Sequence, residues 1–318
     1  MAAPNASLTH SRTLSSRRSS RSSWALATLS AGAFHTCGIA LHGRQAVCWG
    51  RDDVGQSSPP PRVKFAAISS GEWHTCGVTT GHHVNCWGSN VYGQAVPPDA
   101  LATFTSVSSG FLHTCAITTA SDAVCFGRND NSEATPPART LFISVSAGFM
   151  HTCGVRKDAR AVCFGRNDRG QADAPQLESF ITVAAGNFHS CGVASSGRVV
   201  CWGGSGSDGE KSVPAGVAFA SVSVGGYHSC GIATAGGRTF CWGRNDHGES
   251  AAPAADLACV SAGAWHTCGL DAAGGPICWG WDRYGQSRRR DVRVASRRGA
   301  RLAARQHTRL HRAQLRDE

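Results

Sequence analysis

The sequence has no apolar run long enough to cross a membrane as a helix, which limits any contact with a bilayer to its surface. It also lacks the apolar stretch that a secretory signal places after its basic residues, because Arg17, Arg18 and Arg21 lead directly into a repeated sequence. The Arg- and Ser-rich opening is therefore compatible with an organelle transit peptide, a disordered tail or a mistaken gene start. No nucleophile elbow, phosphate-binding loop or kinase signature is present, so we predict no catalytic residue and no cofactor.

Excess charge is missing from most of the chain, although the formal net charge is +10. Residues 1–24 contribute +4 and residues 288–318 contribute +8, whereas residues 25–287 have 16 basic and 18 acidic side chains. The central body is thus slightly acidic and offers no overall basic field to a polyanion. A nucleic acid or an anionic membrane would have to bind through the Arg-rich ends, which are most simply solvated extensions.

A tripeptide, His-Thr/Ser-Cys, recurs seven times at intervals of 38 or 39 residues. A second cysteine follows the first by ten or eleven residues, and an aromatic residue and a glycine come directly after it. Such self-similarity at a fixed period indicates a repeat architecture. The repeated histidines are His35, His74, His113, His151, His189, His228 and His266.

Each repeat reads as short strands separated by glycine-containing turns, with no helical period. A unit of this length with three or four strands is typical of one propeller blade, and seven units can close a ring that protects most strand edges. We therefore predict an all-β fold, a seven-bladed β-propeller made of seven 38/39-residue repeats over residues 25–287. A basic, disordered segment (1–24) is expected before it and an Arg-rich tail (288–318) after it.

The repeats resemble the regulator of chromosome condensation repeat family, as in Val145-Ser146-Ala147-Gly148, His151-Thr152-Cys153-Gly154 and Asn167-Asp168-Arg169-Gly170-Gln171. The resemblance covers all seven repeats and implies a seven-bladed propeller. Short repeats with paired cysteines are most similar to the ectodomains of crinkly-type plant receptor kinases. The repeat length is also similar to that of the propeller-type β-lactamase inhibitory proteins of bacteria. Because one fold hosts many functions, the resemblance does not by itself identify one.

The two cysteines of each repeat are placed to form a disulfide. In the hairpin from Cys76 to Cys86, antiparallel pairing that puts Val78 opposite Val84 also puts the two cysteines face to face. The eleven-residue hairpins pair in the same way with a two-residue loop such as His42-Gly43. Buried, reduced thiols are the alternative. The predicted pairs are Cys37–Cys48, Cys76–Cys86, Cys115–Cys125, Cys153–Cys163, Cys191–Cys201, Cys230–Cys241 and Cys268–Cys278, with Cys259 left over as a small packing residue.

The seven histidines are predicted to be structural, since a general base is normally one residue in one asymmetric pocket. We expect each of them to form a hydrogen bond that ties its strand to a neighbouring segment. A zinc site is a second interpretation, because His74 and Cys76 lie on one strand face with Cys86 opposite. No fourth ligand recurs at a fixed place, so we predict no metal site.

A large apolar side chain precedes each histidine. In the family that the repeats resemble, the segment between the glycine and the histidine is similar to a loop that reaches one face of the ring. Exposed rings there would bind a partner, because binding hot spots favour Trp and Tyr; alternatively, these side chains fill gaps between blades. The tryptophans after the second cysteine, such as Trp49 and Trp202, are expected in the core. The partner-face candidates are Phe34, Trp73, Leu112, Met150, Phe188, Tyr227 and Trp265.

The favoured function is a non-enzymatic scaffold that presents one propeller face to a protein partner. The alternative is a guanine-nucleotide exchange factor for a small GTPase of the Ran type, as the founding member of the resembled family implies. That factor has longer repeats and an inserted hairpin wedge, which these uniform repeats lack. The plant ultraviolet photoreceptor of the family needs tryptophans one place before the candidates, and none is present there. Paired cysteines favour an oxidising, extracytoplasmic compartment, whereas reduced cysteines would indicate the cytoplasm or nucleus.

Overall fold

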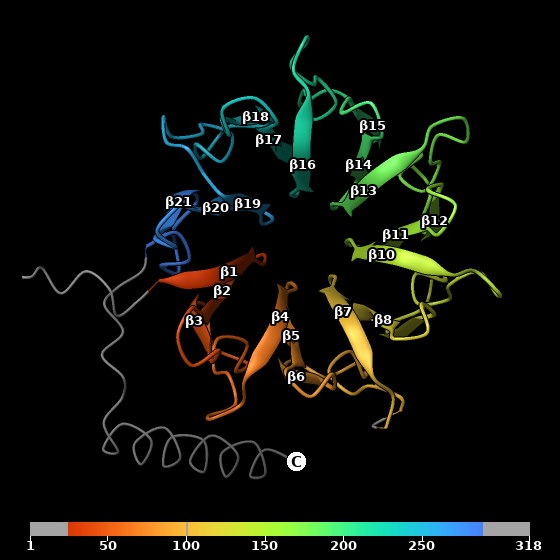
Figure 1. Ribbon diagram of the computed structural model, residues 1–318, viewed down its shortest axis with the longest axis vertical. Helices are drawn as coiled ribbons and strands as arrows, with labels where there is room; N and C mark the ends of the chain where they lie inside the picture. The colour runs from red at the N-terminus through yellow and green to blue at the C-terminus, as the bar shows by residue number, and fades with distance from the viewer. Residues whose placement is uncertain (1–24, 100, 289–318) are drawn as a thin grey trace, which may run out of the picture.

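The computed structural model describes residues 25–99 and 101–288, which form seven three-stranded antiparallel sheets arranged as blades around an axis (Figure 1). The chain passes once around the ring, and we number the blades 1 to 7 in sequence order. Blade 7 therefore lies beside blade 1 (Figure 1). The prediction of a seven-bladed, all-β propeller is confirmed, with three strands in each blade. The predicted basic segment 1–24 and, apart from Arg288, the predicted Arg-rich tail 288–318 lie outside the described residues.

Each blade uses three consecutive strands, and the first strand of each blade contacts the first strand of the next around the axis. Blades 1 to 3 contain β1 (Leu26–Ala31), β2 (His35–Ala40) and β3 (Ala46–Gly50); β4 (Phe65–Ser70), β5 (His74–Thr79) and β6 (Val84–Gly88); β7 (Phe104–Ser109), β8 (His113–Thr118) and β9 (Ala123–Gly127). Blades 4 and 5 contain β10 (Phe142–Ala147), β11 (His151–Arg156) and β12 (Ala161–Gly165); β13 (Phe180–Ala185), β14 (His189–Ala194) and β15 (Val199–Gly203). Blades 6 and 7 contain β16 (Phe219–Val224), β17 (His228–Ala233) and β18 (Thr239–Gly243); β19 (Cys259–Ala262), β20 (His266–Leu270) and β21 (Pro276–Gly280).

The second and third strands of every blade are joined by a disulfide. Cys76 pairs with Cys86 and Val78 with Val84 in the β5–β6 ladder, which is the register expected from the hairpin length. The seven bonds link the seven predicted pairs, with Cα atoms 4.0–4.1 Å apart. Cys259 is the one free cysteine of the described residues; it is half-buried, and burial raises the pKa of its thiol. The cysteines that a zinc site would need are therefore bonded to each other.

The hydrophobic core lies between blades. Ile39 of blade 1 packs with Phe65 and Trp87 of blade 2, and Leu26 and Trp49 of blade 1 share a cluster with residues of blade 7. A single three-stranded blade cannot cover its own faces, so each apolar face is buried by its neighbour. Trp49 and Trp202 are buried, as expected from their place after the second cysteine.

The seven repeated histidines are buried and join adjacent blades. Each imidazole Nε2 lies 2.7–2.8 Å from the Thr or Ser hydroxyl that follows the histidine of the next blade, as in His35 to Thr75. The series closes on itself, because His266 of blade 7 reaches Thr36 of blade 1. The strand-to-neighbour hydrogen bond expected for these residues is therefore present, and the neighbour is the adjacent blade.

The hydroxyl groups decide which imidazole nitrogen carries the proton. Six of the seven donate to the backbone carbonyl of a buried Gln or Glu in the turn after the preceding blade, as Thr75 does to Gln56 at 3.0 Å. A hydroxyl whose proton is used in this way accepts from Nε2–H, so Nδ1 of the neutral ring is unprotonated. Nδ1 has no hydrogen-bond partner among the described residues, and a protonated ring would bury an unpaired N–H. Burial accordingly lowers the pKa of each of these histidines to about 3.

Replacing Thr36 by valine is expected to destabilise the propeller by about 1–3 kcal/mol, because the buried Nε2–H of His266 would lose its acceptor. The Thr36 hydroxyl also donates to the Gln286 carbonyl, and this carbonyl would still accept a hydrogen bond from the Trp49 indole N–H, 2.9 Å away. Thr36→Ser is the matched control, since serine already occupies the equivalent place in blades 5 and 6. Denaturant unfolding of the three proteins checks this, and equal stability of the valine and serine variants would contradict it.

Candidate functional site

The partner-face candidates lie on seven equivalent loops between the first and second strands. A glycine begins each loop, and its backbone closely approaches the next blade: a Cβ on Gly71 would overlap the carbonyl oxygen of Gly110. The following N–H donates across the same junction, as from Glu72 to Gly110, and these bonds link all seven loops into a ring. All seven candidates are half-buried. The loops therefore occupy one end of the first strands, around the axis.

Aromatic rings on these loops contact one another from blade to blade. Phe111 stacks on Phe149 with ring centres 4.2 Å apart, and further contacts at 5.2–5.9 Å run through Phe188 and Tyr227 to Trp265. On the other side of the ring, Phe34 lies 5.4 Å from Trp73. Of the candidates, Phe34, Trp73, Phe188, Tyr227 and Trp265 are thus brought together, whereas Leu112 and Met150 have no aromatic ring to contribute.

Sequence reasoning missed a second set of residues on this face. The residue after each third strand bonds through its backbone N–H to the carbonyl of the loop candidate, as Arg51 does to Phe34 at 2.9 Å. In blade 7 this residue is Trp281, and it closes the aromatic series by contacting Phe34 at 5.9 Å and His247 at 6.3 Å. We call the connected rings the aromatic belt; they are Phe111, Phe149, Phe188, Tyr227, Trp265, His247, Trp281, Tyr284, Phe34 and Trp73.

Arginine side chains are interleaved with the belt. The guanidinium of Arg51 lies 4.4 Å from the ring centre of Trp73, and Arg169 lies 4.6 Å from that of Phe188. Arg244 lies 5.4 Å from both Tyr227 and Trp265. Cations over aromatic faces at these distances are attracted by the ring quadrupole. For Arg51 and Arg244 the sequence signal is an arginine directly after Trp-Gly, whereas Arg169 lies in the turn that follows Phe164-Gly165. Nothing in these local patterns places the guanidinium beside an aromatic ring of its own or the next blade.

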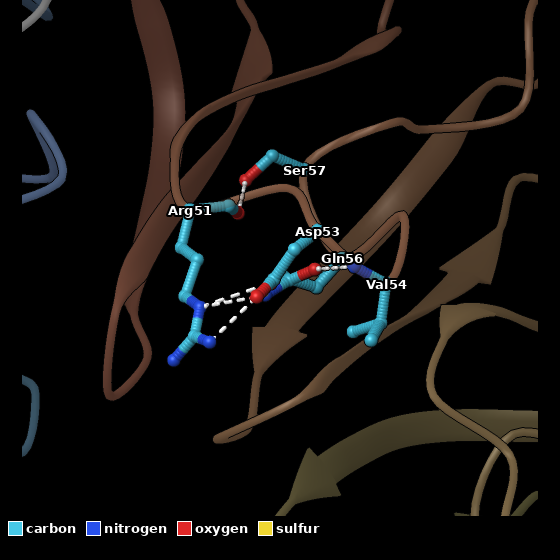
Figure 2. A network of polar contacts seen from close by, with 5 residues as sticks. All are labelled: Arg51, Asp53, Val54, Gln56 and Ser57. Atoms are coloured by element: carbon cyan, nitrogen blue, oxygen red, sulfur yellow. Dashed lines mark hydrogen bonds and ion pairs between the residues drawn. The ribbon is translucent and has the colours of Figure 1, made fainter. Parts of the chain in front are cut away.

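The turn after β3 holds Arg51 in place. Figure 2 shows the Arg51 guanidinium donating to the Asp53 carboxylate, with Nε at 2.8 and 2.9 Å from its two oxygens. Gln56 accepts from the Val54 N–H at 3.0 Å and donates to Asp53 at 3.1 Å, while Ser57 donates to the Arg51 carbonyl at 2.7 Å (Figure 2). The side-chain hydrogen bond from Arg51 helps to lower the pKa of Asp53 against the opposing effect of burial. Arg51 is therefore oriented by its own turn before any partner is bound.

The described residues contain no group of three His, Cys, Asp or Glu side chains close enough to hold a metal ion. Within the same ranges, no helix has the length and apolar character of a membrane span. The prominent chemistry of this face is thus its aromatic rings, its arginines and the loops around the axis.

Comparison with solved structures gives two ectodomains of plant receptor kinases. The chain is 26% identical to the entire ectodomain of CR4 from Physcomitrella patens, with a TM-score of 0.70 over 80% of this chain and 74% of that one. It is 25% identical to the CRINKLY ectodomain of ACR4 from Arabidopsis thaliana, with a TM-score of 0.68 over 80% of this chain and 97% of that one. Human WBSCR16, at 14% identity and a TM-score of 0.65 over 76% of this chain and 85% of that one, shares the fold.

A search of curated protein sequences found no match. The regulator of chromosome condensation (RCC1) repeat matches residues 65–94, 104–133, 142–171, 180–210, 219–249 and 258–286. These matches fall in blades 2 to 7, and the structure shows that residues 26–50 form an equivalent first blade. The matches together cover more than half of the sequence, and the chain therefore belongs to the regulator of chromosome condensation (RCC1) repeat family.

Proposed function

We propose that the protein is a non-catalytic scaffold that binds a protein partner through the face of the aromatic belt. The observation that carries this proposal is the series of contacting rings, most of them half-buried, with arginines beside them on one face. Trp, Tyr and Arg supply most of the energy at protein interfaces, and their rings bury much area at a small entropic cost. Contacts between the rings hold them in place, so less ordering is needed when a partner binds.

An extracytoplasmic location is part of the same proposal. Seven disulfides form and persist in oxidising compartments and are rare in cytosolic proteins. The similar structures from plant receptor kinases are ectodomains. A propeller presented outside the cell would meet its partner there, with the belt as the contact surface.

The double variant Trp73→Ala, Trp265→Ala is expected to lose partner binding at least tenfold, because truncating an interface hot spot costs about 2 kcal/mol or more. The matched control is Ile143→Ala, Ile181→Ala, which removes two exposed side chains at the opposite end of the first strands. Tagged full-length proteins are cross-linked in extracts of the source organism, and the captured partner is purified for measurement of Kd.

Equal binding by a correctly folded belt variant and the control would contradict the proposal. So would enzymatic exchange: small GTPases loaded with a fluorescent guanine nucleotide are expected to release it at the spontaneous rate in the presence of this protein. Accelerated release at substoichiometric amounts of the protein would instead favour the exchange-factor alternative.

A further inference from the structure

A small cavity opens on the propeller axis, inside the aromatic belt. Its volume is about 90 Å³, and all seven blades contribute lining residues from the ends of their first strands and the loops that follow. This is several times the volume that one water requires. Most of the lining residues are Gly, Ala, Ser and Val, and the charged one is Glu72, with Asn187 as an amide. The lining of this cavity therefore departs from sevenfold repetition, because one blade contributes an acidic residue to it.

Glu72 lies at the break in the aromatic belt. Ring contacts run from Phe111 through the other blades to Trp73, but none joins Trp73 directly to Phe111 among the described residues, although their blades are adjacent. The Glu72 N–H donates to the Gly110 carbonyl at 3.2 Å, so the acid sits directly beside the Phe111 loop. Phe111 and Phe149, stacked on each other, line the same cavity.

Neighbouring groups offset only part of the cost of ionising the Glu72 carboxyl in this position. Burial raises its pKa to about 7, and a hydrogen bond from Trp73 and the charge of Arg51 lower it only in part. Arg51 forms its ion pair with Asp53 and stacks on Trp73. An ionised carboxylate removed from water is costly unless a cation pairs with it, so the cavity favours a positively charged group.

We propose that this cavity receives one arginine side chain from a loop of the protein partner, with its guanidinium paired to Glu72 and lying over the ring of Phe111. The inference rests on the proposed function and names the chemistry of the partner at the centre of the face. A guanidinium suits the site because it is planar, is less strongly hydrated than an ammonium and combines an ion pair with stacking on an aromatic face. The remaining small lining residues leave room for the side-chain stem.

Methylguanidinium is the probe for this site, and N-methylurea is its neutral counterpart of similar shape. The full-length protein is expected to bind methylguanidinium with a Kd on the order of 1 mM and the urea at least tenfold more weakly, measured by ligand-observed NMR. Glu72→Gln keeps the size of the side chain and is expected to weaken methylguanidinium binding at least tenfold. Phe111→Leu is expected to weaken it about threefold, since an exposed cation–π contact contributes about 0.5–1 kcal/mol. Glu178→Gln, outside the cavity, is the control and should bind as the unchanged protein does.

Equal binding of the two probes, or full binding by a folded Glu72→Gln variant, would overturn the inference. Partner binding separates it from the proposed function. If Trp73→Ala, Trp265→Ala loses the partner while Glu72→Gln retains it, the cavity does not receive a partner arginine and the scaffold proposal stands. If neither variant loses the partner, the proposed function fails, and the arginine inference fails with it.

Discussion

Reducing the seven disulfides is expected to unfold the propeller under conditions in which the oxidised protein is stable. Each bond closes a loop of ten or eleven residues, which removes about 3 kcal/mol of chain entropy from the unfolded state. Seven such bonds contribute on the order of 20 kcal/mol in this account, more than the whole stability of a typical domain. Thermal unfolding with and without a reductant measures the effect, and thiol titration of the denatured protein should find one free cysteine before reduction and fifteen afterwards.

Single-bond variants provide the control for reduction. Replacing Cys115 and Cys125 together by alanine is expected to cost about 2–3 kcal/mol, whereas Cys259→Ser removes no bond and should change stability by less than about 1 kcal/mol. A reduced protein that melts at the temperature of the oxidised protein would contradict the prediction. A thiol count of fifteen before reduction would contradict the disulfides themselves.

Acid is expected to destabilise the propeller steeply below about pH 6.5. Burial lowers the pKa of each of the seven inter-blade histidines to about 3 in the folded state, from 6.5 in the unfolded chain. The stabilisation is therefore present above pH 6.5 and is lost as the pH falls towards 3, because only the unfolded state takes up protons over this range. For each proton taken up on unfolding, the free energy of unfolding falls by about 1.4 kcal/mol for each pH unit of acidification.

Glu72 opposes this trend, since its folded-state pKa is raised to about 7 and it releases a proton on unfolding near pH 5. Seven histidines against one carboxyl leave a net uptake of about six protons, or about 8 kcal/mol per pH unit near pH 5. Denaturant unfolding between pH 7.5 and pH 5 checks the slope, and His113→Gln should reduce the uptake by about one proton. A stability that stays constant over this range would show that the histidines are not buried as neutral rings.

The hairpins and their disulfides could be predicted from the sequence because the decisive contacts are local. Cys76 and Cys86 are ten residues apart, and the two-residue period of a strand permits one register that brings them together. For the histidines, the sequence predicted a hydrogen bond to a neighbouring segment but did not identify the partner residue. His35 bonds to Thr75, 40 residues away, because the ring places β2 beside the next blade, and no local pattern specifies that neighbour.

The sequence by itself determined that this chain forms seven blades of one pattern, because one unit of 38 or 39 residues cannot cover its own apolar faces and seven copies can close a ring in which neighbours cover them. Only the tertiary structure decided what gathers on the face. Phe34 and Trp281 lie at opposite ends of the described chain, yet their rings meet where blade 7 closes onto blade 1. Glu72 reads as one variable residue among seven, and its half-buried place at the axial cavity, together with Phe111, arises because the loops converge there. Local periodicity specifies the repeating unit, whereas the closure of the ring determines which side chains of different units come together.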